Sequence, residues 1–528
     1  MLISITDFKG EMPLRTPRLL PDVAGTFAVN TRLDSGAIRP FNATTFVTDL
    51  VSAQKAVYLD GATWLSWNAE VNVVPGPTDN DERLYVTGDG APQMYADDTW
   101  FALALPPPDT APAISLLGTL DPDAAETVTY AYTFVTSYGE ESAPSPLATS
   151  IEWSPGLAVR VTSFDTPTAD RAITSIRLYR SATSESGITG LYFVSEFSTA
   201  TATYDHDIDA DPINELISTT DHDTPPTGLK GLIAMPNGMM VAHTKRQLLF
   251  SEPYQPHAWP IKYRLTTDYD IVGLAAFGSY LAVMTKGTPY RGQGTHPDTF
   301  TLEKIEENLP CLAKRGIVDL GYAAAYPSAD GLVVVTSSSA QIVTRHLFNR
   351  LSWTQLDPSS FVASHLNGRY LFGFSGTIAG AGGKTGIIDL TGADPYFSRS
   401  DVKVKCAFND IRTGLLYVQD VDNNLVIFDD PDSTDFLAQT WKSKLYDLAF
   451  PVGFGWCRVE GTALIDPLDD FTIRIFADGV ELHTSTSLNT PFRLPGGLAE
   501  HWQISIEGSA EVTSIALATS IEELARRV

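Results

Sequence analysis

The residues with the most suggestive spacing for phosphate chemistry lie in a glycine-rich loop, residues 380–386, which reads GAGGKTG. A phosphate-binding loop of this kind requires a further glycine five residues before the glycine that precedes its lysine. That position is Ile378, and the loop is followed by IIDL, which is typical of a strand and not of a phosphate-binding helix. The pattern therefore favours a hairpin loop between two strands.

A second glycine pair, Gly292 and Gly294, has the spacing that begins a dinucleotide fingerprint. The third glycine of that fingerprint would fall at Pro297, which cannot replace it. We therefore assign this segment to a turn.

Alternating aspartates in the stretch DHDIDAD have the spacing at which side-chain oxygens bind Ca²⁺ in an EF-hand loop. Such a loop needs Gly at its sixth position and Glu at its twelfth, where this chain has Ala210 and Leu216, so an EF-hand is excluded. A looser calcium site between two domains and a solvated acidic connector both stay open. The residues in question are Asp205, Asp207, Asp209 and Asp211.

Signatures of enzyme active sites are missing from the sequence. It contains no GxSxG, no HExxH and no repeated Ser-x-Asp-x-Gly-x-x-Trp box, and its 9 histidines are dispersed. The cysteines, Cys311, Cys406 and Cys457, are far apart and odd in number, which fits a chain assembled in a reducing cytoplasm. We expect no catalytic residue, no cofactor and no metal ligand, and predict that the protein is not an enzyme. A glycan-degrading enzyme would need two carboxyl groups about 5 to 10 Å apart in a cleft.

Four aromatic residues, Trp64, Trp67, Tyr95 and Trp100, lie close together in the sequence. They would suit a platform on which sugar rings stack, but aromatic side chains in β-rich chains more often fill a core or a subunit contact. We favour the core or contact role and keep carbohydrate binding as the alternative.

Length and charge limit the classes of function. A chain of 528 residues predicts about three or four domains. Its 36 Lys and Arg against 63 Asp and Glu give a formal charge of −27, which argues against a protein that grips nucleic-acid phosphates through a basic face. No apolar stretch reaches membrane-spanning length, and the N-terminus lacks the pattern of a secretory signal, so we expect neither.

Repeated turns and strands predict an all-β fold, with a helical pattern only in residues 520–528. A unit of turn, glycine and apolar strand recurs in PNGMMVAH, FGSYLAVMT, ADGLVVVTS, NGRYLFGF and RTGLLYVQD, and a further copy is plausible at residues 80–88. Spacings close to 40 to 50 residues are typical of propeller blades, in which Gly supplies the positive φ of a hairpin turn. We predict a β-propeller, with an array of β-sandwiches as the alternative. The key glycines are Gly238, Gly278, Gly331, Gly368 and Gly414.

The remaining segments differ from these repeats. After the rigid PPPDTAP, a meander of strands with a Gly, Glu, Ser and Pro-rich turn at residues 139–146 resembles a fibronectin type III or immunoglobulin-like sandwich. Beyond the acidic DDPDSTD, Asp478 and Gly479 are a strong hairpin signal. We predict four regions: an N-terminal segment with the first propeller strands (1–106), an inserted fibronectin III-like sandwich (107–223), the propeller blades (224–438) and a C-terminal β-sandwich (439–528).

Several phrases in correct succession resemble the tail nozzle proteins of short-tailed bacteriophages, also called tail tubular protein B-like or tail hub proteins. The likeness covers most of the chain. In chain order, the phrases are MLISITDFKGEMPLRTPRLLPDVAGTFAVNTRLDSGAIRPF (1–41), LKGLIAMPNGMM (229–240), SEPYQPHAWP (251–260), IVGLAAFGSYLAVMTKGTPYRGQG (271–294), LPCLAKRGIVDLGYAAAYPSADGLVVV (309–335) and QTWKSKLYDL (439–448).

This resemblance implies a structural virion protein of the viral tail, assembled in the cytoplasm of the bacterial host. It implies a homohexameric ring below an adaptor or connector protein, near tail fibres or spikes, that retains the genome before infection and conducts DNA during ejection. The family transfers no active-site residue. The acidic composition agrees, because carboxylates lining a channel repel DNA phosphates and let the duplex slide without sequence-specific binding. The alternative is a receptor-binding tail adhesin that recognises a host-surface glycan.

Overall fold

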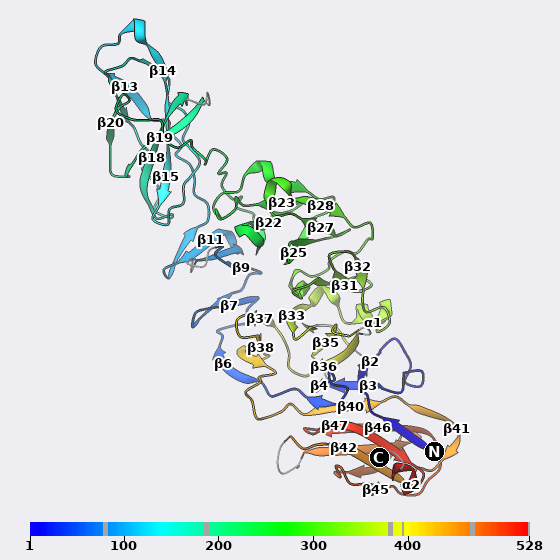
Figure 1. Cartoon of the computed structure of the whole chain (residues 1–528). Helices are drawn as coiled ribbons and strands as arrows, with labels where there is room; N and C mark the ends of the chain where they lie inside the picture. The colour runs from blue at the N-terminus through cyan, green and yellow to red at the C-terminus, as the bar shows by residue number, and fades with distance from the viewer. Residues whose placement is uncertain (78–82, 184–188, 379–383, 393–394, 465–469, 526–528) are drawn as a thin grey trace.

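Strands are by far the predominant regular elements of the described residues, as Figure 1 shows, so the predicted all-β class is confirmed. The computed structural model describes residues 1–77, 83–183, 189–378, 384–392, 395–464 and 470–525. Short runs rich in Val, Ile, Tyr and Phe form the strands, because their side chains fill a pleated and largely buried surface. Residues 380–383 of the glycine-rich loop lie outside the described residues, while the residues after the loop form strand β35 (Thr385–Asp389).

Among the described residues, seven antiparallel units, which we call blades A to G, form the centre of the molecule, and blade F is one end of a larger sheet. Blade A has two strands and each of the other six has four. The blades are A (β7 Ala56–Asp60, β8 Thr63–Trp67), B (β9 Asn72–Pro75, β10 Leu84–Gly88, β11 Gly90–Ala96, β12 Thr99–Ala102), C (β21 Lys230–Ala234, β22 Met240–Thr244, β23 Gln247–Phe250, β24 Leu265–Thr266), D (β25 Ile271–Phe277, β26 Tyr280–Thr285, β27 Tyr290–Gln293, β28 Thr301–Lys304), E (β29 Val318–Asp319, β30 Ala324–Ser328, β31 Gly331–Val335, β32 Ala340–Ile342), F (β33 Val362–Leu366, β34 Arg369–Gly373, β35, β36 Tyr396–Ser400) and G (β37 Cys406–Asp410, β38 Leu415–Gln419, β39 Asn424–Phe428, β6 Thr45–Asp49).

The first strands of the blades follow one another around a common axis. Strand β9 contacts β21, and the series continues through β25, β29, β33 and β37 to β7. Blade G takes its outermost strand, β6, from the N-terminal part of the chain, which ties the two ends of the propeller together. The predicted β-propeller is thus present.

Glycines with positive φ lie at the predicted hairpins, but one of them belongs to a different turn. Gly238, Gly278, Gly368 and Gly414 each lie between the first and second strands of a blade, with φ of 68°, 57°, 80° and 72°. In blade E, Gly331 is the first residue of the third strand, β31, and the position equivalent to the other four glycines is Gly321, between β29 and β30, with φ of 83°. The sequence favoured Gly331 because the apolar run after it, LVVV, is the stronger strand signal. The copy expected at residues 80–88 falls in blade B as β10, and residues 80–82 lie outside the described residues.

A separate module, the inserted module, interrupts the propeller between blades B and C and extends from one end of the molecule in Figure 1. Two main sheets, of strand order β13-β17-β20 and β15-β18-β19, enclose its apolar core together with the pair β14-β16. Its identity as a fibronectin type III sandwich stays a prediction. Its strands are β13 (Ala113–Leu117), β14 (Glu126–Val128), β15 (Tyr130–Thr136), β16 (Ile151–Trp153), β17 (Ala158–Thr162), β18 (Ile173–Thr183), β19 (Thr189–Ser198) and β20 (Thr203–Asp207).

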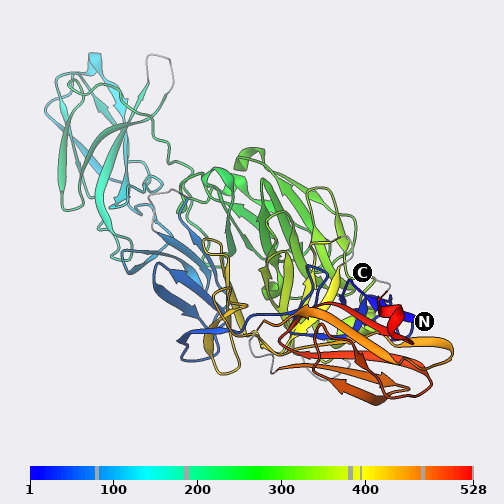
Figure 2. The ribbon, with the colours of Figure 1, turned by 60° about the horizontal axis from the view of Figure 1, so that its bottom comes forward.

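A third module, the terminal module, contains both ends of the chain (Figure 2). Strand β1 pairs with β47, and Phe8 lies fully buried against Trp441 in the same core. The first residues of the chain therefore pack in this module as well as leading into the propeller. Asp478 and Gly479 form the expected hairpin, with φ of 47° and 80°. The strands are β1 (Leu2–Ile5), β2 (Lys9–Glu11), β3 (Ala24–Val29), β40 (Gln439–Ser443), β41 (Tyr446–Val452), β42 (Trp456–Thr462), β43 (Phe471–Ala477), β44 (Val480–Ser485), β45 (Phe492–Arg493), β46 (Ala499–Gly508) and β47 (Glu511–Ala518), with the short pair β4 (Thr31–Arg32) and β5 (Arg39–Pro40) nearby.

One sheet joins the propeller to the terminal module. Blade F continues from β36 through β2 and β3 to β40, β46, β43 and β44. A buried ion pair reinforces this junction, where Arg399 Nε lies 3.1 Å from Glu11 Oε2. Burial raises the pKa of Glu11 to about 7, while Arg399 counteracts a further rise. Since both elements belong to one hydrogen-bonded sheet, the two modules are stiffly coupled.

Helices are few and short. The expected terminal helix is present as α2 (Ile521–Ala525), but α1 (Arg350–Gln355) was not expected. Asn349 caps α1 by accepting a hydrogen bond from the Ser352 backbone N–H at 2.8 Å. Within α1, the side chain of Trp353 is buried. In the described part of the chain, neither helix is long and apolar enough to cross a bilayer. The 3₁₀ turns are η1 (Pro122–Ala124), η2 (Pro236–Gly238), η3 (Ile261–Tyr263), η4 (Pro297–Thr299), η5 (Lys314–Gly316) and η6 (Pro358–Ser360).

Candidate functional site

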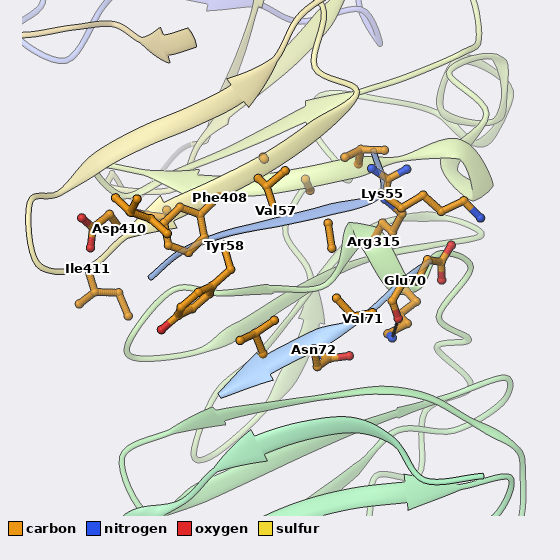
Figure 3. A pocket seen from close by; sticks show the side chains of 18 of the residues that line it. Lys55, Val57, Tyr58, Glu70, Val71, Asn72, Arg315, Phe408, Asp410 and Ile411 are labelled. Atoms are coloured by element: carbon orange, nitrogen blue, oxygen red, sulfur yellow. Dashed lines mark hydrogen bonds between the residues drawn. The ribbon is translucent and has the colours of Figure 1, made fainter. Parts of the chain in front are cut away.

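The axis of the propeller holds a pocket of about 630 Å³. The first strands of blades A, B, F and G and the turn η5 line it, as Figure 3 shows, with Asp410 and Tyr58 toward one end and Lys55, Glu70 and Arg315 toward the other. These strands converge because every blade begins at the centre of the ring. The pocket is therefore a product of propeller closure.

Most charged groups of this axial pocket already have partners within the protein. Lys314 Nζ donates to the Glu70 carbonyl oxygen at 2.8 Å, and Arg315 donates to the Lys405 carbonyl oxygen. Burial lowers the pKa of Lys314 to about 8, so the amine is still largely protonated at neutral pH. These bonds stiffen the hub and leave few free donors for a ligand.

The carboxylate of Asp410 is engaged in the same way. Arg412 Nε donates to Asp410 Oδ1 at 3.1 Å, and Thr413 Oγ1 donates to Oδ2 at 3.1 Å. Burial alone would raise the pKa of Asp410, but these hydrogen bonds outweigh it and lower the pKa. Among the described lining residues there is no Ser, Cys or His that would pair with this carboxylate as a nucleophile or general base.

A second group of buried charges lies where the inserted module meets the propeller. Glu140 forms ion pairs with Arg83 of blade B, at 3.3 Å, and with Arg171 of the inserted module. Glu140 and Arg171 are 4 % and 1 % exposed, so neither charge has water as an alternative partner. His257 Nδ1, from the connection that follows β23 of blade C, lies 3.7 Å from Glu140 Oε1. We call this cluster, with Glu141, the junction cluster.

Glu141 extends the junction cluster into the inserted module. Its carboxylate accepts hydrogen bonds from Arg177 Nη1, Tyr179 Oη and Thr133 Oγ1, each at 2.7 Å. Its carbonyl oxygen accepts from His257 Nε2 and from a ring nitrogen of His222, each at 3.0 Å. The sequence placed both glutamates in a turn of the inserted module, and no local signal shows that distant arginines and histidines converge on them.

The alternating aspartates are divided among different partners. Asp205 forms a two-pronged ion pair with Arg160 of the neighbouring strand, with both distances 2.8 Å. Asp209 accepts a hydrogen bond from the Gly156 backbone N–H, and Asp211 lies 3.0 Å from His206 Nε2. In the described chain, no group of three or more His, Cys, Asp or Glu side chains is arranged to hold a metal ion.

The four aromatic residues separate into two groups. Trp64 packs between blades A and G, with its ring 4.9 Å from Tyr417 and 5.8 Å from Phe408. Trp67 and Tyr95 instead contact Trp100, with ring centroids 6.3 and 4.7 Å from it. The predicted core role is thus correct for Trp64, while Trp100 is 39 % exposed and forms part of a surface cluster.

The remaining candidates from the sequence are Gly292 and the three cysteines. Gly292 lies inside β27, paired with β26 and β28, and not in the expected turn; the Phe300 ring occupies the space that a Cβ would fill, which favours glycine there. All three cysteines are buried and unpaired. Burial raises the pKa of Cys311 to about 12 and also raises the pKa values of Cys406 and Cys457, which makes their thiols unreactive.

Comparisons with known proteins give only distant likenesses. No family model and no curated protein matches the chain. The WD40 domain of Pan2 from Neurospora crassa is 12% identical with a TM-score of 0.28, over 69% of this chain and 90% of that one. The CNH domain of AfRom2 is 9% identical with a TM-score of 0.25, over 65% and 90%. Hsv2 from Kluyvelomyces marxianus is 10% identical with a TM-score of 0.23, over 54% and 85%. The propeller assignment rests on the strand pairing described above.

Proposed function

We propose that this chain is a structural, non-enzymatic subunit of the tail nozzle of a short-tailed bacteriophage. In this proposal six copies form a ring in the virion tail, assembled in the host cytoplasm and attached to an adaptor protein near tail fibres or spikes. The ring retains the genome before infection and conducts DNA during ejection. The resemblance of the sequence phrases to this family suggested the function.

The continuous connection between the modules is the observation that carries the proposal. A single hydrogen-bonded sheet joins blade F to the terminal module, and Glu11 with Arg399 is buried at that junction. At the other end, the ion pair of Glu140 with Arg83 of blade B connects the inserted module to the propeller. An elongated subunit whose modules are joined by a shared sheet and buried ion pairs suits a channel wall, which must keep its diameter while DNA passes.

Charge supports the same function. Each subunit has a formal charge of −27, so a ring of six would present a strongly acidic assembly to DNA. Acidic walls repel phosphates, and the duplex would pass without adhering.

The experiment that tests the proposal is electron microscopy of the particles that contain this chain, with symmetry analysis of the tail. A six-fold ring on the tail axis, with a channel wide enough for duplex DNA, is the expected result. A peripheral position beside the axis, or three-fold spikes, would contradict it. Fitting the subunit into the map would show which carboxylates face the channel, and a basic wall would contradict the charge argument.

The surface cluster of Trp67, Tyr95 and Trp100 favours a second candidate, a tail adhesin that binds host-surface glycan. Exposed aromatic rings stack against sugar rings. Binding of the purified protein to a glycan array, weakened at least about tenfold by Trp100→Ala and unchanged by Phe46→Ala at another exposed site, would favour this candidate.

A further inference from the structure

Blade A is incomplete in comparison with its neighbours. It contains only β7 and β8, whereas each of the other six blades has four strands. The inner strand β7 contacts β37 of blade G, so blade A occupies a regular position in the ring. Strand β8 pairs with β7 on one side, and no described strand pairs with its other edge. An edge of this kind presents unpaired backbone N–H and C=O groups.

Both faces of β8 contact neighbouring blades. Residues alternate between faces in a strand, so Trp64 and Trp67 point in opposite directions. Trp64 contacts Tyr417 of blade G, and Trp67 contacts Trp100 of blade B. The pair β7-β8 is therefore packed between both neighbours as the inner half of a blade.

Beyond β8, the neighbouring blades carry apolar side chains that are only partly covered. On blade G, Ile427 of β39 and Val47 of β6 are half-buried members of the cluster around Trp64. On blade B, Tyr95 is half-buried and Trp100 is exposed. In a four-stranded blade, the third and fourth strands lie farther from the axis than the second strand, where they cover apolar side chains of the neighbouring blades. The position of the missing third and fourth strands of blade A, which we call the gap, lies beside these side chains.

Acidic groups flank the gap. Asp97 and Asp98 form the turn between β11 and β12, where they accept hydrogen bonds from Tyr138 and Tyr95, each at 3.0 Å. Neither is within ion-pair distance of a Lys or Arg among the described residues. They line a pocket of about 830 Å³ beside the turn between β7 and β8, together with Arg83 and Arg412, whose charges are paired with Glu140 and Asp410.

We propose that the outer half of blade A is completed by a β-hairpin from another protein, with apolar side chains on both faces and basic residues near its turn. The unpaired edge of β8 supplies backbone hydrogen bonds, the rings supply the apolar contacts, and the carboxylates select a cationic partner. A second copy of this chain is the competing occupant, and the test below distinguishes it from a hairpin of another protein. This inference does not depend on the tail assignment.

The test uses the full chain and two synthetic probes. Each probe is a disulfide-cyclised hairpin with alternating Val and Thr, and its turn and ends carry Lys in one probe and Glu in the other. Amide hydrogen exchange of residues 63–67 reports on the β8 edge, and fluorescence anisotropy gives the affinity. We expect the lysine hairpin to slow exchange at β8 about tenfold or more and to bind with Kd below about 1 mM, and the glutamate hairpin to do neither.

Variants separate the two contributions. Trp100→Ala should weaken the lysine hairpin about tenfold, and Asp97→Lys with Asp98→Lys should abolish the preference for lysine over glutamate. Matched controls are Phe46→Ala, exposed on the other face of β6, and Asp207→Lys in the inserted module. Both should leave the affinity for the lysine hairpin and the preference for lysine over glutamate unchanged.

Three results would overturn the proposal. One is β8 amides that are already protected in the free protein at low concentration. Another is a lysine hairpin that fails to protect β8, or protects it no better than the glutamate hairpin. The third is concentration-dependent self-association that protects the same amides without any probe, since the occupant would then be a second copy.

Discussion

His257 Nε2 donates a hydrogen bond to the carbonyl oxygen of Glu141 at 3.0 Å, although the two residues are 116 positions apart. His257 belongs to a connection within blade C, and Glu141 to a loop of the inserted module. Burial lowers the pKa of His257 to about 3, so the ring is neutral and keeps its acceptor nitrogen toward Glu140. The contact joins two modules through a neutral imidazole.

This histidine makes folding stability depend on pH. Its pKa is about 3 in the folded chain against the ordinary value of 6.5 in the unfolded chain, so between these values the unfolded chain binds a proton that the folded chain does not. The contribution of His257 to the free energy of unfolding is fully present above about pH 6.5. It falls by up to about 1.4 kcal/mol per pH unit as the pH drops toward 3. The difference in slope between the wild type and His257→Gln, from denaturant unfolding between pH 7 and 4, measures this contribution, because His243 and Glu11 also have shifted pKa values in this range. His257→Gln keeps a donor without titrating and should flatten the slope, whereas His483→Gln should leave it unchanged.

Removal of Glu140 should destabilise the junction cluster severely. Glu140→Ala leaves Arg171 buried without its carboxylate, which costs about 3–5 kcal/mol in the free energy of unfolding. Asp205→Ala breaks an ion pair on the surface of the same module and should have no measurable effect. Denaturant unfolding of both variants gives the comparison, and equal effects would show that the burial of Glu140 has no energetic consequence.

The N-terminal segment should be essential for the terminal module. Phe8 is fully buried and packs edge-on against Trp441 with ring centroids 5.1 Å apart, so Phe8→Ala should cost about 3–5 kcal/mol. Leu19 lies in the same segment but is 71 % exposed, and Leu19→Ala should be close to neutral. Hydrogen exchange should show that the amide protection lost in Phe8→Ala is concentrated in β46 and β47. Loss of protection confined to the propeller would contradict this assignment.

Blade hairpins should differ in their tolerance of a side chain. Gly368 has φ of 80°, and a Cβ there would lie 2.4 Å from Thr391 Cγ2, so Gly368→Ala combines backbone strain with a clash. Gly414 has φ of 72° and open space, so Gly414→Ala should cost only about 1–2 kcal/mol. Gly496 has open space and no positive φ, which makes Gly496→Ala the neutral control. Thermal unfolding should rank the three variants in that order, and an equal effect of the first two would argue against the clash.

Local features of the sequence predicted local structure well. Apolar runs between Gly and Pro predicted strands, and Asp478-Gly479 predicted a hairpin, because φ preference and side-chain alternation are properties of neighbouring residues. The helix α1 was missed, since its cap at Asn349 and its buried Trp353 become recognisable only when the surrounding blades are in place.

The sequence by itself determined an acidic, all-β protein built from repeated hairpins, with glycines where positive φ is required. Only the tertiary structure decided that Gly321 and not Gly331 is the equivalent turn of blade E, that β6 closes blade G, and that blade A stops after two strands. It also decided which charges are buried, as at Glu140 and Glu141. The physical reason is that register, closure and ion pairing depend on contacts between residues far apart in the chain, which local propensity does not encode.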